Sequence, residues 1–270
     1  MNQILVLYAY YEKDEVYKNN LELFLRKGIY SECDYVFIVN GKSTVDIPNV
    51  SNIRVLSKAN EDYDFGAYNH ALNNIQYDQY KYIIFMNTSV RGPFIPPYVR
   101  MKWYEPFIDM LKDDKNKVKL VGTTINILSS PTPISRIFEN YSGFSRPHTH
   151  VQTQFFAMDK ECLEFLLSKE LFSSKCYNNF TDIIVIKELM MSQLVLHNGW
   201  NINAIVAGYN GLDYRTLQND VNFSGYGHDP GFANTCFGRT IHPYECIFIK
   251  TNRNLCPNEI NSLSQLLLNN

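Results

Sequence analysis

Asn87, Ser89 and Arg91 place amide, hydroxyl and guanidinium groups directly after the apolar run 82–86. A short, uninterrupted apolar run of this kind is typical of a strand that is buried on both faces of a mainly parallel sheet. Open α/β sheets bind their ligands at the carboxyl ends of their strands. We therefore expect a ligand beside 87–89. Arg91 is then either a charge clamp for an anion or a member of a surface salt bridge.

The ligand atoms at this position are neutral, which leaves the role of a metal open. Amide and hydroxyl oxygens bind a hard cation less well than carboxylates do. One interpretation is that Asn87 and Ser89 hold a divalent cation, Mn²⁺ or Mg²⁺, weakly and with help from another residue. The other is that Arg91 partly replaces the cation as the positive charge at the site.

A second group of candidates lies in the segment 60–68, ahead of a helix expected over 67–75. Gly66 permits a tight turn or a close approach of the backbone, and the free N–H groups of a helix start suit a phosphate. Asp64 has two possible roles. It accepts hydrogen bonds from a ribose or sugar hydroxyl, or it only caps the helix.

A third group follows a long polar loop and comprises Arg239, His242, Glu245 and Lys250. Such a segment can fold back over a site and supply His242 to a metal or diphosphate. Lys250 or Arg239 would then bind phosphate. The alternative for His242 is a purely structural role, which is the commoner one for a single histidine.

Glu188 is the one acidic residue in the apolar stretch 183–191 of a helix expected over 183–198. It is a candidate general base for an acceptor hydroxyl if it points into the cleft. The alternative is an exposed residue paired with a neighbouring cation.

The elements that would position these residues alternate in the manner of a βαβ fold. The sequence predicts one α/β domain over 1–270, with a mainly parallel central sheet flanked by helices. The polar segment 209–239 is expected to be a lid or binding loop, and 247–250 to end the ordered core. Strands are predicted at 3–8, 35–39, 53–56, 82–86, 119–124, 149–158 and 202–207, and helices at 13–28, 67–75, 99–113, 159–167 and 183–198.

The composition is that of an ordinary globular protein, with 45% hydrophobic and 19% charged residues. A net charge of −2 without a basic run argues against nucleic acid as the main partner. No window approaches the roughly 18 apolar residues that span a bilayer, and the N-terminus is expected to form a strand rather than a signal peptide. The six cysteines are scattered, so we expect reduced thiols and a cytoplasmic protein.

Several motifs together resemble the glycosyltransferases of the rhamnan-synthesis F type and related fungal, plant and large-virus proteins. The resemblance covers most of the chain and is specific only when the motifs are combined. They are D-F-G-A-Y at 64–68, F-M-N-T-S-V-R-G-P-F at 85–94, V-G-T-T-I-N at 121–126, Q-x-x-F-F-A-M at 152–158 and G-R-T-I-H-P-Y-E-C-I-F-I-K-T-N-R at 238–253.

This resemblance implies a GT-A-like fold that binds a nucleotide-sugar donor, such as a UDP-sugar, at its strand ends. It implies transfer of a sugar, for example the deoxyhexose rhamnose, to a hydroxyl of a growing polysaccharide, with manganese as the typical metal. Many members read Asn-Asp-Ser at 87–89, so this chain lacks the acidic residue. By the resemblance, His242 falls on the metal or diphosphate site, and the donor side comprises Asp64, Gly66, Tyr68, Asn87, Ser89 and Arg91.

Two alternatives to an active glycosyltransferase remain. One is a catalytically inactive GT-A-like module that binds a nucleotide or a glycan, which the missing acidic motif favours. The other is a nucleotidyltransferase. The first strand ends at 8–11 without a Gly-rich or basic loop, and this argues against that class. The Asn- and Lys-bearing composition suggests a viral protein from a large DNA virus, or a protist protein.

Overall fold

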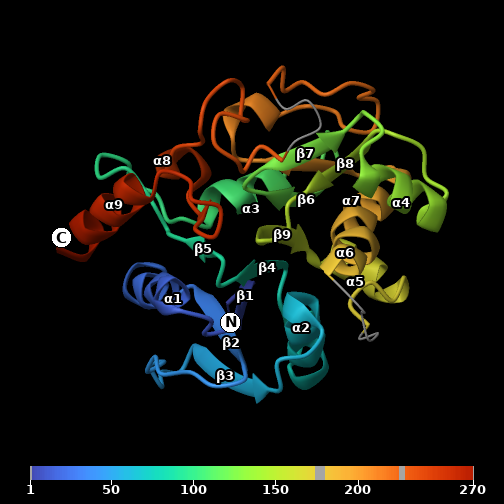
Figure 1. Ribbon diagram of the computed structural model, residues 1–270. Coiled ribbons are helices and arrows are strands. Elements are labelled where there is room, and N and C mark those ends of the chain that lie inside the picture. Colours follow the sequence, from blue (N-terminus) through green and yellow to red (C-terminus); the bar gives the residue numbers. More distant parts are fainter. Residues whose placement is uncertain (1, 174–179, 225–228, 270) are drawn as a thin grey trace.

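A seven-stranded sheet forms the centre of the computed structural model, which describes residues 2–173, 180–224 and 229–269 (Figure 1). Its strand order is β10-β6-β9-β4-β1-β2-β3, and the pairs β5/β11 and β7/β8 form two small antiparallel ladders. The strands are β1 (Ile4–Tyr10), β2 (Cys33–Asn40), β3 (Ile53–Lys58), β4 (Tyr82–Asn87), β5 (Val90–Arg91), β6 (Val118–Gly122), β7 (Ile125–Leu128), β8 (His148–Val151), β9 (Phe155–Asp159), β10 (Asn201–Ala204) and β11 (Ile249–Lys250).

The sheet is mainly parallel because crossover helices join its strands. β1 pairs in parallel with both β2 and β4, whereas β9 runs antiparallel between β4 and β6. All seven residues of β1 are buried, and alternate side chains enter opposite cores. The continuous apolar runs of β1 and β4 thus arise from burial on both faces.

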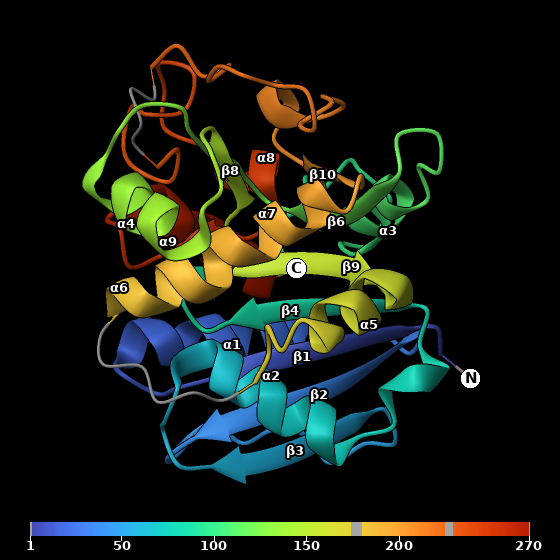
Figure 2. The same cartoon turned by 90° about the vertical axis from the view of Figure 1, so that its right-hand side faces the viewer.

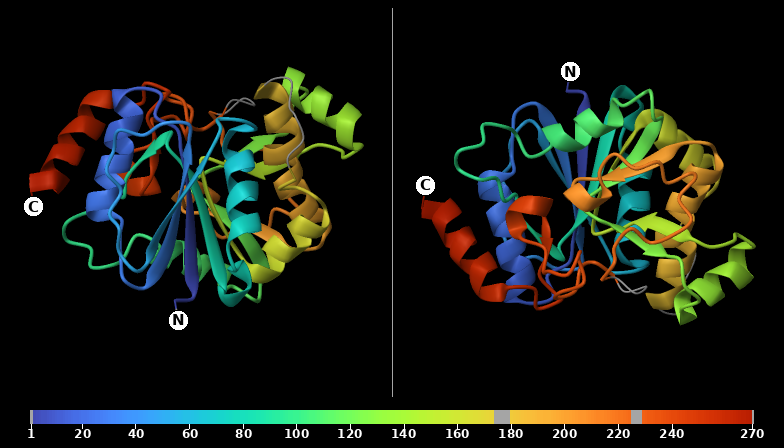
Figure 3. Two further views of the ribbon diagram at one scale, coloured as in Figure 1. Left: turned by 90° about the horizontal axis from the view of Figure 1, so that it is seen from below. Right: turned by 90° about the horizontal axis from the view of Figure 1, so that it is seen from above.

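Helices cover both faces of the sheet (Figures 2 and 3). One core lies under α2, α5 and α7, the other under α1 and α3, and α9 packs on α1. The helical elements are α1 (Glu15–Lys27), α2 (Tyr63–Asn74), η1 (Tyr77–Gln79), α3 (Glu105–Leu111), α4 (Pro133–Ser142), α5 (Lys160–Ser168), α6 (Phe180–Ile183), η2 (Ile184–Leu189), α7 (Met190–His197), η3 (Ala207–Tyr209), α8 (Pro243–Cys246) and α9 (Pro257–Asn269).

The predicted fold class is confirmed, and four predicted elements are corrected. α2 begins at Tyr63, four residues earlier than expected, and α3 is shorter than the predicted helix over 99–113. The predicted strand 149–158 is two strands, because the chain leaves the β7/β8 ladder and joins the central sheet at β9. The ordered core does not end at 247–250, since α9 follows it. The assignment of 1–270 to one domain stays a prediction.

The long polar segment has little regular structure in its described residues, as predicted. Within 210–224 and 229–242, the isolated bridge Cys236–Arg239 is the only regular backbone pairing between η3 and α8. The five described cysteines are free thiols, and Cys176 lies outside the described residues. None of the described helices is both long and apolar enough to cross a membrane.

Candidate functional site

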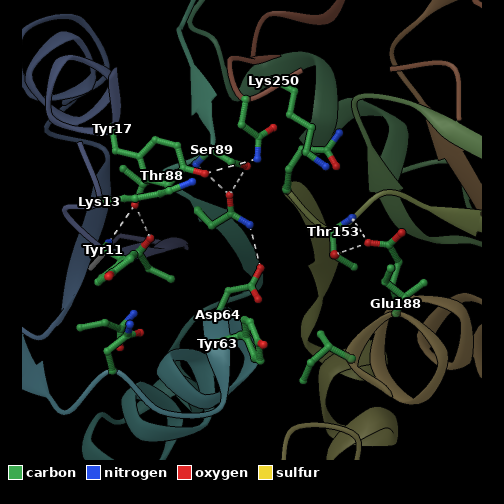
Figure 4. Close-up of a pocket in the computed structure, with 18 residues that line it drawn as sticks. Tyr11, Lys13, Tyr17, Tyr63, Asp64, Thr88, Ser89, Thr153, Glu188 and Lys250 are labelled. Atoms are coloured by element: carbon green, nitrogen blue, oxygen red, sulfur yellow. Dashed lines mark hydrogen bonds between the residues drawn. The ribbon is translucent and has the colours of Figure 1, made fainter. Parts of the chain in front are cut away.

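A cleft of about 310 Å³ lies at the carboxyl ends of β1, β2 and β4 (Figure 4). The start of α2 and η2 form two of its walls, and β11 contributes a side chain from above in the view of Figure 4. Its lining comprises Ala9, Tyr11, Lys13, Tyr17, Asn40, Asn60, Tyr63, Asp64, Asn87, Thr88, Ser89, Thr153, Gln154, Ile183, Ile184, Glu188, Lys250 and Asn252.

Asn87 forms the floor of this cleft, and both ends of its amide are engaged. The backbone N–H of Ser89 donates to Asn87 Oδ1 at 3.0 Å, and Ser89 Oγ donates to the same oxygen at 2.6 Å. A backbone N–H can only donate, so the atom that faces it must be the amide oxygen. Asn87 Nδ2 therefore faces Asp64 and donates to its Oδ2 at 2.7 Å.

Thr88 fixes the turn to the end of β1. Its hydroxyl donates to Ala9 O at 3.0 Å and accepts the backbone N–H of Tyr11 at 3.0 Å. Its carbonyl accepts a hydrogen bond from the buried Asn20 amide at 2.7 Å. These bonds bring the first and fourth strands to one edge and hold Tyr11 at the cleft. The turn 87–89 is thus a rigid polar frame without charge of its own.

Asp64 reaches the cleft from the first turn of α2 and is not the helix cap that one sequence interpretation offered. The chain enters α2 through Asp62 and Tyr63, whose φ values of 59° and 54° are left-handed. Gly66 makes this entry possible, because a Cβ there would lie 2.7 Å from Glu61 O. Burial raises the pKa of Asp64, and the hydrogen bond from Asn87 opposes the rise.

Glu188 enters the cleft from η2, a π-helical turn between α6 and α7. Such turns re-aim side chains within a helix and are frequent at functional sites. Glu188 Oε2 accepts hydrogen bonds from Thr153 Oγ1 at 2.5 Å and Thr153 N at 3.3 Å. His150 Nε2 lies 3.4 Å from Oε1. Burial alone would raise the pKa of Glu188, but the contacts with His150 and Thr153 and the charge of Lys250 lower it to about 2.

Lys250 supplies positive charge close to both carboxylates. β11 pairs with β5, which places Lys250 opposite Val90 and just beyond the turn 87–89. Burial and the charge of Arg253 lower the pKa of Lys250, whereas Asp229, Glu188 and Asp64 raise it. Lys250 Nζ has no hydrogen-bond or ion-pair partner among the residues that the structure describes. The ammonium is therefore available to an anionic ligand.

Five of the residues expected from the sequence lie together at this cleft: Asp64, Asn87, Ser89, Glu188 and Lys250. Gly66 and Tyr68 do not line it. Gly66 shapes the start of α2, and the Tyr68 ring is buried against Phe85 with centroids 5.1 Å apart.

Arg91 is buried away from the cleft, which differs from both sequence interpretations. Its Nε donates to Asn20 Oδ1 at 2.7 Å and its Nη1 to Asn261 Oδ1 at 2.8 Å. The guanidinium therefore connects α1 to α9. Neither a clamp on a ligand in this cleft nor a surface salt bridge describes this position.

His242 likewise lies outside the cleft lining, and both of its ring nitrogens are engaged. Nδ1 accepts the backbone N–H of Tyr244 at 3.1 Å, which caps α8, and Nε2 lies 2.8 Å from Glu259 Oε1. These contacts correspond to the structural alternative for His242. The structure does not bring it to Asn87 or Ser89.

Asn87 and Ser89, the metal ligands expected from the sequence, do not fit a site for a divalent cation in this arrangement. Asn87 Oδ1 already accepts two hydrogen bonds from Ser89, so a metal would have to displace them. Hard cations prefer several carboxylate or carbonyl oxygens. The described residues contain no group of three or more His, Cys, Asp or Glu side chains that would hold a metal.

The sequence reasoning missed several lining residues. Tyr11 and Lys13 follow β1, and Asn40 is the last residue of β2. The rule that placed Asn87 at a ligand site would therefore also have found them. Thr153 and His150 carry no comparable signal, because their contact with Glu188 depends on the packing of β8 against η2.

Comparisons with known proteins leave the family of the chain open. No family model matches the chain, so the resemblance to the rhamnan-synthesis F type is not confirmed, and no curated protein matches either. Among solved structures, similarity is found to a galactosyltransferase, LgtC, in complex with donor and acceptor sugar analogues, at 8% identity and a TM-score of 0.49, over 97% of this chain and 95% of that one.

Two further solved structures are similar at the same level. A glycosyltransferase involved in the glycosylation of the major capsid of PBCV-1 has 10% identity and a TM-score of 0.43 over 99% of each chain. The mannosyltransferase PcManGT from Pyrobaculum calidifontis, in complex with GDP-Man and Mn²⁺, has 11% identity and a TM-score of 0.46 over 75% of this chain. This chain spans about half the length of that mannosyltransferase, with 54% of it covered. TM-scores below 0.5 at such low identity assign neither a family nor an activity.

Proposed function

We propose that the protein is a glycosyltransferase that moves a sugar from a nucleotide-diphosphate donor to a glycan hydroxyl. One observation carries this proposal. The cleft at the strand ends holds the ammonium of Lys250, which has no protein partner in the described part of the chain. It lies near the ionised carboxylate of Glu188 and above the neutral polar turn 87–89. A cation for the leaving diphosphate and a carboxylate for the acceptor are the two charges that an inverting transfer uses.

The donor would lie along the carboxyl edge of the sheet. Lys250, with the exposed Lys13 at the rim, would bind the diphosphate, and Asp64 would accept a hydrogen bond from a sugar or ribose hydroxyl. Asn87 and Ser89 would form a rigid floor that fixes the distance between Lys250 and Asp64. This arrangement holds the leaving group in place, and positioning is a large part of such catalysis.

The acceptor would approach Glu188 from the side of η2, where Ile183 and Ile184 add apolar surface. In an inverting transfer, Glu188 would accept the proton of the attacking hydroxyl while the bond between the anomeric carbon and the diphosphate breaks. The motif resemblance suggests rhamnose or another hexose as the sugar and a polysaccharide as the acceptor.

A screen of nucleoside diphosphates by thermal shift tests the donor site. UDP, GDP, TDP and, for comparison, CMP would each be added at about one hundred times Kd, where binding stabilises the fold by roughly 2.7 kcal/mol. We expect one nucleoside diphosphate to raise the melting temperature by a few degrees. No shift with any of them would contradict the donor site.

A second candidate function is a catalytically inactive module with the same binding site. The observation in its favour is the pKa of Glu188, about 2, because so weak a base takes up a proton poorly. Hydrolysis of the nucleotide-sugar donor in the absence of acceptor distinguishes an active enzyme from an inactive module. An active enzyme releases nucleoside diphosphate above the spontaneous rate, whereas an inactive module binds the donor and releases none.

A further inference from the structure

Lys250 is held rigidly beside the turn 87–89, for which the sequence suggested a metal. The β5/β11 ladder fixes its backbone opposite Val90, and the backbone N–H of Thr251 donates to Ser89 O at 2.8 Å. The Thr251 hydroxyl donates to the same carbonyl at 3.1 Å and accepts a hydrogen bond from Asn20 at 2.8 Å. The lysine side chain therefore starts from a fixed point immediately next to Asn87 and Ser89.

Two carboxylates from different walls of the cleft share it with Lys250. Four side chains with a formal charge line the cleft, namely Lys13, Asp64, Glu188 and Lys250, within the described part of the chain. Lys13 is exposed at the rim, so Lys250 is the cation that interacts with both carboxylates. Asp64 comes from α2 and Glu188 from η2 on different walls, as Figure 4 shows.

Three of the neighbouring oxygen atoms already accept hydrogen bonds from the protein. Asn87 Oδ1 accepts two bonds from Ser89, and Asp64 Oδ2 accepts one from Asn87. Thr153 donates twice to Glu188 Oε2. A metal held through Asn87 Oδ1 would therefore have to displace the bonds from Ser89. Any metal in the cleft would also lie near the ammonium of Lys250, which repels it.

We propose that the ammonium of Lys250 takes the place of a divalent cation at the donor diphosphate, so that the protein binds its nucleotide without metal. This inference rests on the proposed donor site and specifies how that site neutralises the phosphates. Lysine is a compact charge with three donors, which suits two phosphate oxygens. Asp64 and Glu188 balance the ammonium when the ligand is absent.

Calorimetric titration of the nucleoside diphosphate that binds in the screen tests this inference directly. The titration is performed once in EDTA and once with excess Mn²⁺. We expect the two Kd values to agree within about threefold, a difference below roughly 0.7 kcal/mol. In a separate titration of the protein with Mn²⁺ alone, followed by the electron paramagnetic resonance of free Mn²⁺, we expect no binding at micromolar concentrations.

Variants of Lys250 separate charge from packing. Lys250→Met keeps the length of the stem and removes the charge, and we expect it to weaken binding in EDTA by about 10- to 100-fold. Lys250→Arg keeps the charge and should retain most of the affinity. Lys112→Met is the matched control, because Lys112 is an exposed lysine at the end of α3 paired with Asp109, and it should leave Kd unchanged.

Each result is decisive for one of the two claims. The inference is overturned if the wild type needs Mn²⁺ to bind the nucleotide. It is also overturned if Lys250→Met melts normally and binds the nucleotide as tightly as the wild type. Both results leave the proposed donor site intact. Absence of binding by every nucleotide under both conditions overturns the proposed function, and the inference with it.

Discussion

The two halves of the cleft differ in how they are built and in what they contribute. In the amino-terminal half, the turn 87–89 is formed at adjacent strands and is neutral, and the Asn87 amide and the Thr88 and Ser89 hydroxyls are bonded within the protein. The carboxyl-terminal half brings Glu188 and Lys250, which are 62 residues apart in sequence, to the same space. The first half supplies a frame together with Asp64 and the exposed Lys13, and the second supplies the proposed base and the cation beside both carboxylates.

Loss of the carboxylate in the charged half should have the largest effect. Glu188→Gln keeps the size of the side chain and its acceptor for Thr153, but it removes the base. We expect the turnover number for sugar transfer to fall by about 10²- to 10⁴-fold while the Kd for nucleoside diphosphate changes little. The matched control is Glu164→Gln, an exposed residue of α5 near Lys160, which should keep full activity. Equal turnover in Glu188→Gln and the wild type would remove Glu188 from the mechanism.

Loss of a hydrogen bond in the neutral frame should instead affect stability. Thr88→Val removes the hydroxyl bonds to Ala9 and Tyr11. The backbone N–H of Tyr11 loses its bond to the turn, whereas Ala9 O keeps the backbone N–H of Thr88 at 3.2 Å. We expect the free energy of unfolding to fall by about 1–3 kcal/mol in urea titration. Thr216→Val, at an exposed threonine, should change it by less than about 0.5 kcal/mol. If Thr88→Val left the free energy of unfolding unchanged, the turn 87–89 would not be a rigid support.

The sequence predicted the frame better than the charged half. Asn87 and Ser89 could be placed because an apolar run that ends in polar residues indicates a strand end, and this rule is local. Arg91 follows the same strand, yet its side chain turns under α1 and α9, and the sequence does not show this packing. The π-helical turn that aims Glu188 at Thr153 depends on tertiary contacts, so no periodicity could reveal its partners.

The exposed cation at the rim should contribute much less than Lys250. Lys13 lies in solvent, where salt screens its charge. We expect Lys13→Ala to weaken nucleotide binding by about two- to fivefold at low salt, and less as salt increases. Calorimetry at two ionic strengths measures this. If Lys13→Ala weakened nucleotide binding as much as Lys250→Met does, the diphosphate would have to be placed nearer Lys13 than the account proposes.

The pH dependence should show the smallest change, because the lowered pKa of Glu188 keeps it ionised far below neutrality. A base with a lowered pKa loses activity only as the pH falls through that value. We expect no loss of kcat/KM from protonation of Glu188 between about pH 5 and pH 8. If kcat/KM of the wild type fell in this range and kcat/KM of Glu188→Gln did not, the pKa of Glu188 would be higher in the working enzyme.

A crystal structure with the nucleoside diphosphate that binds most tightly, grown in EDTA, tests the central claim most directly. The account predicts that the phosphates lie within hydrogen-bond distance of Lys250 Nζ, above Asn87 and Ser89, and that the terminal phosphate faces Glu188. A nucleotide bound elsewhere, for example in the cavity lined by Asp34, Asn52 and Tyr80 at the other end of the sheet, would contradict it.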